Sequence, residues 1–164
     1  MAVNLDAIDP TFIEDLSKSH KAVKCVADWA KNLGFVDISL PEDESSKVEQ
    51  DYFKRRRERT QDPGDLWVDG MLWEIKWLGY DFSPGGREIK HWKGMIIDPV
   101  ESMARKKIEP TLYMHLSKSL TVAAVNFVRS TKHAWYTKIP KDNRIGRARR
   151  CYYCPLNLLE YYTL

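Results

Sequence analysis

Residues 64–77, with the sequence GDLWVDGMLWEIKW, constrain the fold more than any other stretch, because two apolar runs flank the dipeptide Asp69-Gly70. A two-residue type I′ turn needs positive φ at both central positions, and Asp-Gly is one of the pairs that tolerate this. The stretch therefore predicts a β-hairpin. Counting outward from the turn places Asp65 directly opposite Glu74, on the same face of the hairpin.

Two opposed carboxylates beside tryptophan and leucine destabilise a sheet unless something compensates their charge. A divalent cation between them compensates it, because Mg²⁺ prefers carboxylate, carbonyl, water and phosphate oxygens. Lys76 lies two residues beyond Glu74 on the same face, where its ammonium can orient an attacking water. The Ile75 carbonyl can add a further ligand. The pattern indicates metal-assisted hydrolysis of a phosphodiester. The competing interpretation is that these are exposed strand-end charges, with Lys76 paired to one carboxylate.

Asp65, followed by Glu74-Ile75-Lys76, resembles the PD-(D/E)XK motif of restriction-endonuclease-like nucleases. The expected order of helix, strand, Asp-bearing strand, Glu-x-Lys strand, helix and strand is also similar to the αβββαβ core of that superfamily. The resemblance implies metal-dependent cleavage of DNA. It also implies that Asp65, Glu74 and the Ile75 carbonyl bind Mg²⁺ or Mn²⁺, and that Lys76 positions the water.

The chain departs from the superfamily pattern at two places. Gly64 stands where the proline of the motif is expected, and Pro63 comes one residue earlier. Many members also carry an acidic residue on the first helix, whereas HKAVKC at residues 20–25 contains none. Glu14, further upstream, is the candidate for that extra acid.

The remaining elements predict one α/β domain over residues 1–164, with a small mixed sheet flanked by helices. Acid-proline pairs predict helices that begin at Asp9-Pro10 and Asp98-Pro99. The first helix is expected to end at Gly34 and the second at Pro110. Further strands are expected at 35–40, 111–117 and 121–128, and a strand or helix at 133–140. The segment at 41–64 is expected to be partly helical or a flap, and the segment at 78–94 a loop. The apolar tail at 151–164 is expected to dock on the body.

Basic residues outside the hairpin are candidates for contact with a nucleic-acid backbone. They lie in KRRRER at 54–59, in the loop at 78–94 and in RIGRARR at 144–150. The candidate residues of the first two segments are Lys54, Arg55, Arg56, Arg57, Arg87, Lys90, Trp92 and Lys93. Each run is equally consistent with an ordinary solvated surface.

The bulk composition is ordinary for a soluble globular protein and argues against a membrane-spanning or disulfide-rich one. The net charge of +3 tolerates a polyanionic partner such as DNA, and no apolar run reaches the length of a membrane span. Without a secretory leader pattern, and with an odd number of cysteines, a cytoplasmic location is expected. Cys151 and Cys154 have the spacing of half a zinc site, but their aromatic and leucine neighbours favour packing. His115 is interpreted as a hydrogen-bonded structural residue.

The sequence therefore predicts a Mg²⁺-dependent deoxyribonuclease, and a homodimer is plausible because cutting two strands needs two active sites. Two alternatives remain open. One is a nucleic-acid-binding module that keeps the fold without cleaving. The other is a protein-interaction factor in which the Asp65 and Glu74 pair is incidental.

Overall fold

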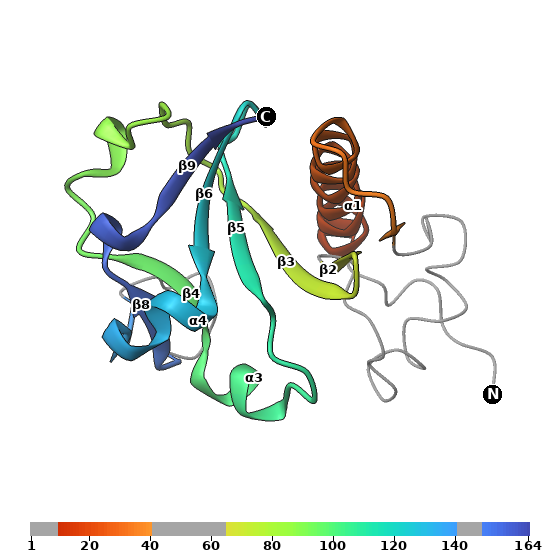
Figure 1. Cartoon of the computed structure of the whole chain (residues 1–164). Coiled ribbons are helices and arrows are strands. Elements are labelled where there is room, and N and C mark those ends of the chain that lie inside the picture. The colour runs from red at the N-terminus through yellow and green to blue at the C-terminus, as the bar shows by residue number, and fades with distance from the viewer. Residues whose placement is uncertain (1–9, 41–64, 141–148) are drawn as a thin grey trace.

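A mixed six-stranded sheet forms the centre of the computed structural model, which describes residues 10–40, 65–140 and 149–164 (Figure 1). The strand order is β1-β2-β3-β5-β6-β9. The strands are β1 (Ile38–Ser39), β2 (Asp65–Val68), β3 (Met71–Trp77), β5 (Leu112–Leu116), β6 (Val122–Phe127) and β9 (Glu160–Thr163). The β3–β5 pair is parallel, while every other pair in this sheet is antiparallel. The predicted mixed α/β class is confirmed.

The β2–β3 hairpin has the predicted register. Asp69 and Gly70 form the turn with φ values of 47° and 77°, and Asp65 pairs with Glu74. The Asp69 carboxylate also accepts the backbone N–H of Asp37 at 2.8 Å and that of Val36 at 3.3 Å. The turn therefore fixes the hairpin and ties it to the segment that follows the first helix.

Helix α1 (Pro10–Asn32) covers one face of the sheet, next to β2 and β3 (Figure 1). It begins at the proline that the sequence indicated and ends just before Gly34, which has φ of 98° and donates its N–H to Lys31 O at 3.0 Å. Its buried residues recur at helical spacing and pack on apolar residues of β2 and β3. These helix residues are Ala22, Val23, Val26, Ala27 and Ala30.

The opposite face of the main sheet packs against a second, three-stranded sheet. Its order is β4-β8-β7, with β4 at Met95–Pro99, β8 at Cys151–Cys154 and β7 at Tyr136–Lys138. Met95, Ile97 and Cys154 are buried in the core between the two sheets. As predicted, the 151–164 tail docks on the body, as β8 and β9.

The region of the second predicted helix is organised differently. A helix does begin here, at Val100 with Pro99 as its N-cap, but Asp98 and Pro99 also end strand β4, which pairs with β8. Helix α3 spans only Val100–Arg105, so it does not reach Pro110. Pairing with β8, more than 50 residues later, places Asp98 in a strand, so its side chain does not cap the helix.

Several shorter elements complete the description. The predicted strand at 35–40 is reduced to Ile38–Ser39, because Val36 and Asp37 bond to the Asp69 side chain instead. The segment at 133–140 contains both predicted possibilities, the end of a 3-10 turn and strand β7. The remaining helical segments are α4 (Val128–Thr131), η2 (Arg87–Ile89), η3 (Lys132–Ala134) and η4 (Leu156–Leu158). No helix in the described ranges is long and apolar enough to cross a membrane.

The turn geometry predicts the effect of substituting one glycine. We expect Gly70→Ala to lower the free energy of unfolding by about 1 kcal/mol, because alanine is strained at positive φ. Gly79→Ala is the matched control: its φ is not in the positive range, and an added Cβ meets nothing within 4 Å at either glycine. Urea unfolding of both variants measures the difference. Equal stability losses would contradict the assigned turn.

Candidate active site

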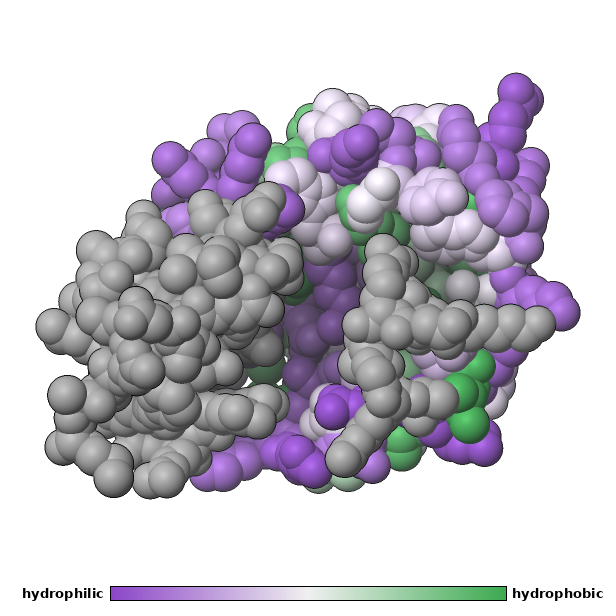
Figure 2. All heavy atoms as spheres, turned by 180° about the vertical axis from the view of Figure 1, so that it is seen from behind, coloured by the Kyte–Doolittle hydropathy of each residue, from purple (hydrophilic) through white to green (hydrophobic). Residues whose placement is uncertain are grey.

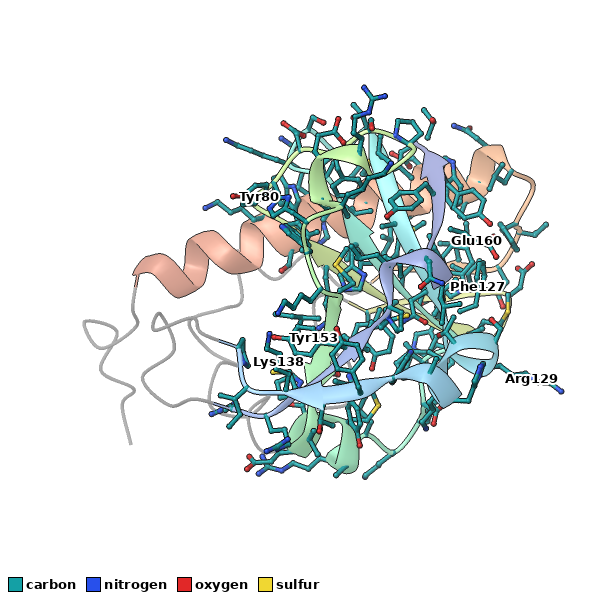
Figure 3. The ribbon with its side chains drawn as sticks, turned by 90° about the vertical axis from the view of Figure 1, so that its left-hand side faces the viewer. Tyr80, Phe127, Arg129, Lys138, Tyr153 and Glu160 are labelled. Atoms are coloured by element: carbon teal, nitrogen blue, oxygen red, sulfur yellow. The ribbon has the colours of Figure 1, made fainter. Side chains whose placement is uncertain are left out.

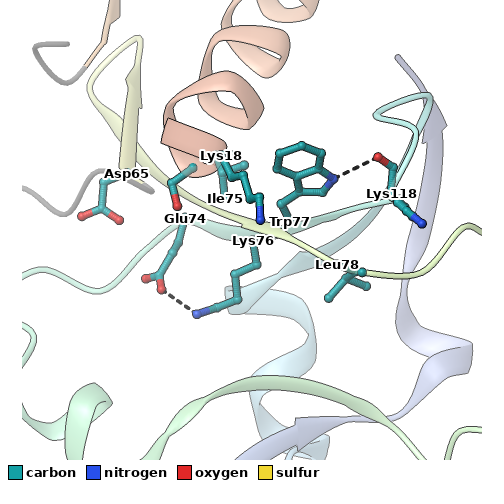
Figure 4. A pocket seen from close by; sticks show the side chains of 10 residues that line it. Lys18, Asp65, Glu74, Ile75, Lys76, Trp77, Leu78 and Lys118 are labelled. Atoms are coloured by element: carbon teal, nitrogen blue, oxygen red, sulfur yellow. Dashed lines mark hydrogen bonds and ion pairs between the residues drawn. The ribbon is translucent and has the colours of Figure 1, made fainter. Parts of the chain in front are cut away.

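Three charged residues of the hairpin share the face of the main sheet that looks away from α1. Trp73 and Ile75 of β3 belong to the core beneath the helix, so the alternating Glu74 and Lys76 point to the opposite face. Asp65 is the direct partner of Glu74 on β2. Figure 4 shows all three side chains at one pocket. The structure brings the sequence-predicted acids and lysine together.

Glu74 is buried and lies between two ammonium groups. Its Oε1 is 3.0 Å from Lys76 Nζ, and its Oε2 is 2.6 Å from Lys106 Nζ. Burial alone would raise the pKa of Glu74, but the two lysines outweigh burial and hold that pKa below its ordinary value. Glu74 is therefore ionised at neutral pH.

Asp98 joins the same cluster from the second sheet. Its Oδ2 lies 3.4 Å from Lys106 Nζ and accepts the Tyr113 hydroxyl at 3.3 Å, while its Oδ1 lies 3.9 Å from Lys76 Nζ. The pKa of Asp98 is raised, mainly by burial. The charge of Glu74 raises this pKa further, and together these two effects outweigh the lowering by Lys76 and Lys106.

Sequence reasoning missed both Asp98 and Lys106. Asp98 was interpreted as a helix cap and Lys106 as an ordinary helix residue. The available signal was the run MIID at 95–98, which is apolar and follows a glycine, as a buried strand often does. A shift in strand pairing between Ile96 and Asp98 then leaves both Ile97 and Asp98 buried, which simple alternation does not predict.

The pocket at Asp65, Glu74 and Lys76 has a volume of about 600 Å³. It is lined by Lys18, Ser19, Asp65, Glu74, Ile75, Lys76, Trp77, Leu78, Gly79 and Lys118. The lining therefore comes from α1, from β2 and β3, and from the turn after β5. From the opposite side to Figure 1, hydrophilic side chains occupy a hollow in the middle of the visible face (Figure 2).

His115 lies next to this cluster in a structural role. It pairs with Lys76 in the β3–β5 register and is almost fully buried. Its Nε2 is 2.8 Å from the Ile96 carbonyl, which can only accept, so Nε2 carries the proton. Burial, followed by the charge of Lys76, lowers the pKa of His115 to about 4. The neutral ring thus connects the two sheets, in agreement with the sequence interpretation.

The predicted nucleic-acid-binding residues lie away from the pocket lining or outside the described residues. Lys54, Arg55, Arg56 and Arg57 are outside the described residues, and so is the side chain of Glu14. Arg87, Lys90 and Lys93 are exposed, but none of them lines the pocket. Trp92 is half-buried and packs edge-to-face on Tyr80, with ring centroids 5.6 Å apart. Trp92 is therefore at least partly a packing residue.

The donor set at the pocket suits a hard divalent cation. Within the described ranges, no group of three or more His, Cys, Asp or Glu side chains is arranged to hold a metal ion by itself. Mg²⁺, however, commonly takes only one or two carboxylates and completes its shell with water and phosphate. Asp65 and Glu74 can provide such a pair. Cys151 and Cys154 are both buried free thiols, which agrees with the packing role expected for them.

The ion pairs of Glu74 predict how stability depends on pH. Because the folded-state pKa of Glu74 lies below its ordinary value of 4.5, its stabilising contribution is complete above that pH and is lost as the pH falls through the lowered pKa. Glu74→Gln should therefore unfold about 2 kcal/mol more easily than wild type at pH 7. Urea unfolding in EDTA should show this gap closing as the pH falls below the ordinary Glu74 pKa of 4.5.

Glu109→Gln supplies the control for that prediction. Glu109 also lies 2.6 Å from a lysine, Lys132, but both side chains are half exposed to solvent. We expect that substitution to change the unfolding free energy by less than about 1 kcal/mol at pH 7. A Glu74 gap that stays constant with pH would contradict the assigned ion pairs.

Comparison of the chain with models of protein families, with curated proteins and with solved structures found no match in any of the three. The functional assignment therefore depends on the chemistry of the pocket. That chemistry consists of two opposed carboxylates on a hairpin, a lysine beside them and a cleft large enough for a ligand.

Proposed function

We propose that the protein is a nuclease that hydrolyses DNA phosphodiester bonds with Mg²⁺ or Mn²⁺. The observation that carries the proposal is the placement of Asp65 opposite Glu74 with Lys76 on the same face, all three at the wall of one pocket. This constellation suits the hydrolysis of a phosphate ester with a hard cation. The 600 Å³ volume leaves space for a nucleotide-sized group.

The fold supports the proposal as well. Helix α1, the antiparallel β2–β3 hairpin and the parallel β3–β5 pair follow one another in an order similar to the restriction-endonuclease-like αβββαβ core. The connection from β3 to β5 differs from that core, because it contains strand β4 and only a six-residue helix. This departure introduces Asp98 beside Glu74.

Each site residue then has a role in the proposed reaction. Asp65 and Glu74, together with the Ile75 carbonyl, would hold the cation, which when bound lowers the pKa of water and stabilises charge on the phosphate. Lys76, with Nζ 3.0 Å from Glu74 Oε1, is placed to orient the attacking water. Ion pairs with Lys76 and Lys106, one to each oxygen, orient the Glu74 carboxylate.

The outer part of the pocket suits the strand that carries the scissile phosphate. Lys18 of α1 and Lys118 of the β5–β6 turn both line it, so two further cations lie in the same pocket as the carboxylates. Trp77 forms part of the wall, with its indole N–H shared between the carbonyls of Ser117 and Lys118 at 3.1 and 3.2 Å (Figure 4). The ring is therefore held rigidly in the pocket wall.

Cleavage assays test the proposed reaction directly. Linear, circular and single-stranded DNA should be degraded only with Mg²⁺ or Mn²⁺, and Glu74→Gln and Lys76→Met should each lose at least about 100-fold in rate. Glu109→Gln should retain the wild-type rate, since Glu109 is an exposed residue that does not line the pocket. The substrate panel also distinguishes end-dependent from internal cutting.

The assay separates the proposal from its alternatives. Metal-independent cleavage, or cleavage that survives both substitutions, would disprove the assigned site. DNA binding without any cutting would favour the binding module, and the absence of both binding and cutting would favour the protein-interaction factor. Dimer formation stays a prediction, and sedimentation of the active protein measures it.

Binding measurements test the assigned substrate strand. We expect Lys18→Ala and Lys118→Ala each to weaken DNA binding and to reduce the slope of log affinity against log salt by about 1, because each removes one phosphate contact. Arg129→Ala is the control, since Arg129 is exposed on α4 and lies at the far side of the view from Tyr80 and Lys138 (Figure 3). Filter binding with Ca²⁺ in place of Mg²⁺ measures affinity without turnover.

If Arg129→Ala reduced the salt dependence of DNA binding as much as the two lysine variants, the affinity would depend only on the total charge of the protein. In that case the pocket would not be the path of the strand.

A further inference from the structure

Two lysines and two carboxylates form a ring of alternating charge, and two of the four, Glu74 and Lys76, line the pocket. Lys106 Nζ lies 2.6 Å from Glu74 Oε2 and 3.4 Å from Asp98 Oδ2. Lys76 Nζ lies 3.0 Å from Glu74 Oε1 and 3.9 Å from Asp98 Oδ1. Each carboxylate therefore presents one oxygen to each ammonium. A position between carboxylate oxygens is also the position that a divalent cation would take.

Of the two lysines, only Lys106 is placed where it can leave without disturbing the sheet. Lys76 belongs to β3, which is paired on both sides, with β2 and β5. Lys106 follows α3, a helix with no buried residue, and its N–H caps that helix by donating to Met103 O at 3.2 Å. Lys106 thus lies outside the strands, while the carboxylates that it contacts belong to strands β3 and β4.

Asp98 is held in a fixed orientation on the other side of this position. Burial, followed by the charges of Glu74 and Asp98, raises the pKa of Tyr113, so its hydroxyl keeps the proton that it donates to Asp98 Oδ2. Asp98 comes from the second sheet, and Glu74 comes from the first. The backbone positions of the two carboxylates therefore depend on strand pairing and not on the ammonium between them.

Building on the proposed metal site, we propose that Lys106 occupies the cation position between Glu74 and Asp98 in the metal-free protein, and that Asp98 is a carboxylate of that same cation site. Lys106 then competes with the divalent cation and sets its affinity. Without a cation, the Lys106 ammonium neutralises carboxylates that would otherwise repel one another across the two sheets.

The measurement is Mn²⁺ affinity without DNA, from the electron paramagnetic resonance signal of free Mn²⁺. Lys106→Met should bind Mn²⁺ about tenfold more tightly than wild type, because a competing ammonium is removed. Asp98→Asn should bind about tenfold more weakly. Lys107→Met is the matched control: Lys107 is the adjacent exposed lysine, so its removal changes net charge equally and should alter affinity less than about twofold.

The outcomes separate this inference from the proposed function. The inference is overturned if Lys106→Met and Lys107→Met bind Mn²⁺ more tightly by the same factor. It is also overturned if either Lys106→Met or Asp98→Asn binds Mn²⁺ with the wild-type affinity. If Glu74→Gln still loses Mn²⁺ in those cases, the proposed metal site stands. Failure of both wild type and Lys106→Met to bind Mn²⁺ overturns the metal site and the inference together. Circular dichroism in EDTA verifies folding, and Lys106→Gln replaces Lys106→Met if that variant does not fold.

Discussion

The two-residue turn at Asp69 and Gly70 is the constraint on which the rest of the site depends. Side chains of a strand alternate between its two faces, so a slip of one residue in this hairpin would move Glu74 and Lys76 into the core beneath α1. The turn prevents such a slip, because both of its residues adopt positive φ and the Asp69 carboxylate bonds to the segment after the helix. The register then places Asp65 opposite Glu74.

The parts of the structure that could be predicted from the sequence are those set by neighbours along the chain. The hairpin register follows from one dipeptide, and the bounds of α1 follow from a proline at its start and Gly34 just beyond its end. The strands near 111–117 and 121–128 follow from apolar runs around a short turn. Asp65, Glu74 and Lys76 could therefore be placed on one face from the amino-acid sequence alone.

The parts that could not be predicted depend on distant partners. Strand β4 exists because Met95–Pro99 pairs with Cys151–Cys154, and no local pattern specifies that pairing. The acid-proline pair at its end has the composition of a helix cap, so Asp98 was assigned to the wrong kind of element. Lys106 was missed for the same reason, since its contact with Glu74 joins residues on separate elements. Tertiary pairing outweighed local propensity at the place where the site is completed.

Glu74 and Asp98 show why the second sheet matters to the chemistry. Both are buried carboxylates with contacts to the same two lysines, yet the pKa of Glu74 is lowered and that of Asp98 is raised. The difference arises because Glu74 lies nearer to both ammonium groups, at 3.0 and 2.6 Å against 3.9 and 3.4 Å for Asp98. Any positive charge that moves closer to Asp98 would favour its ionised form. The second sheet thus supplies a carboxylate whose ionisation depends on the cations beside it.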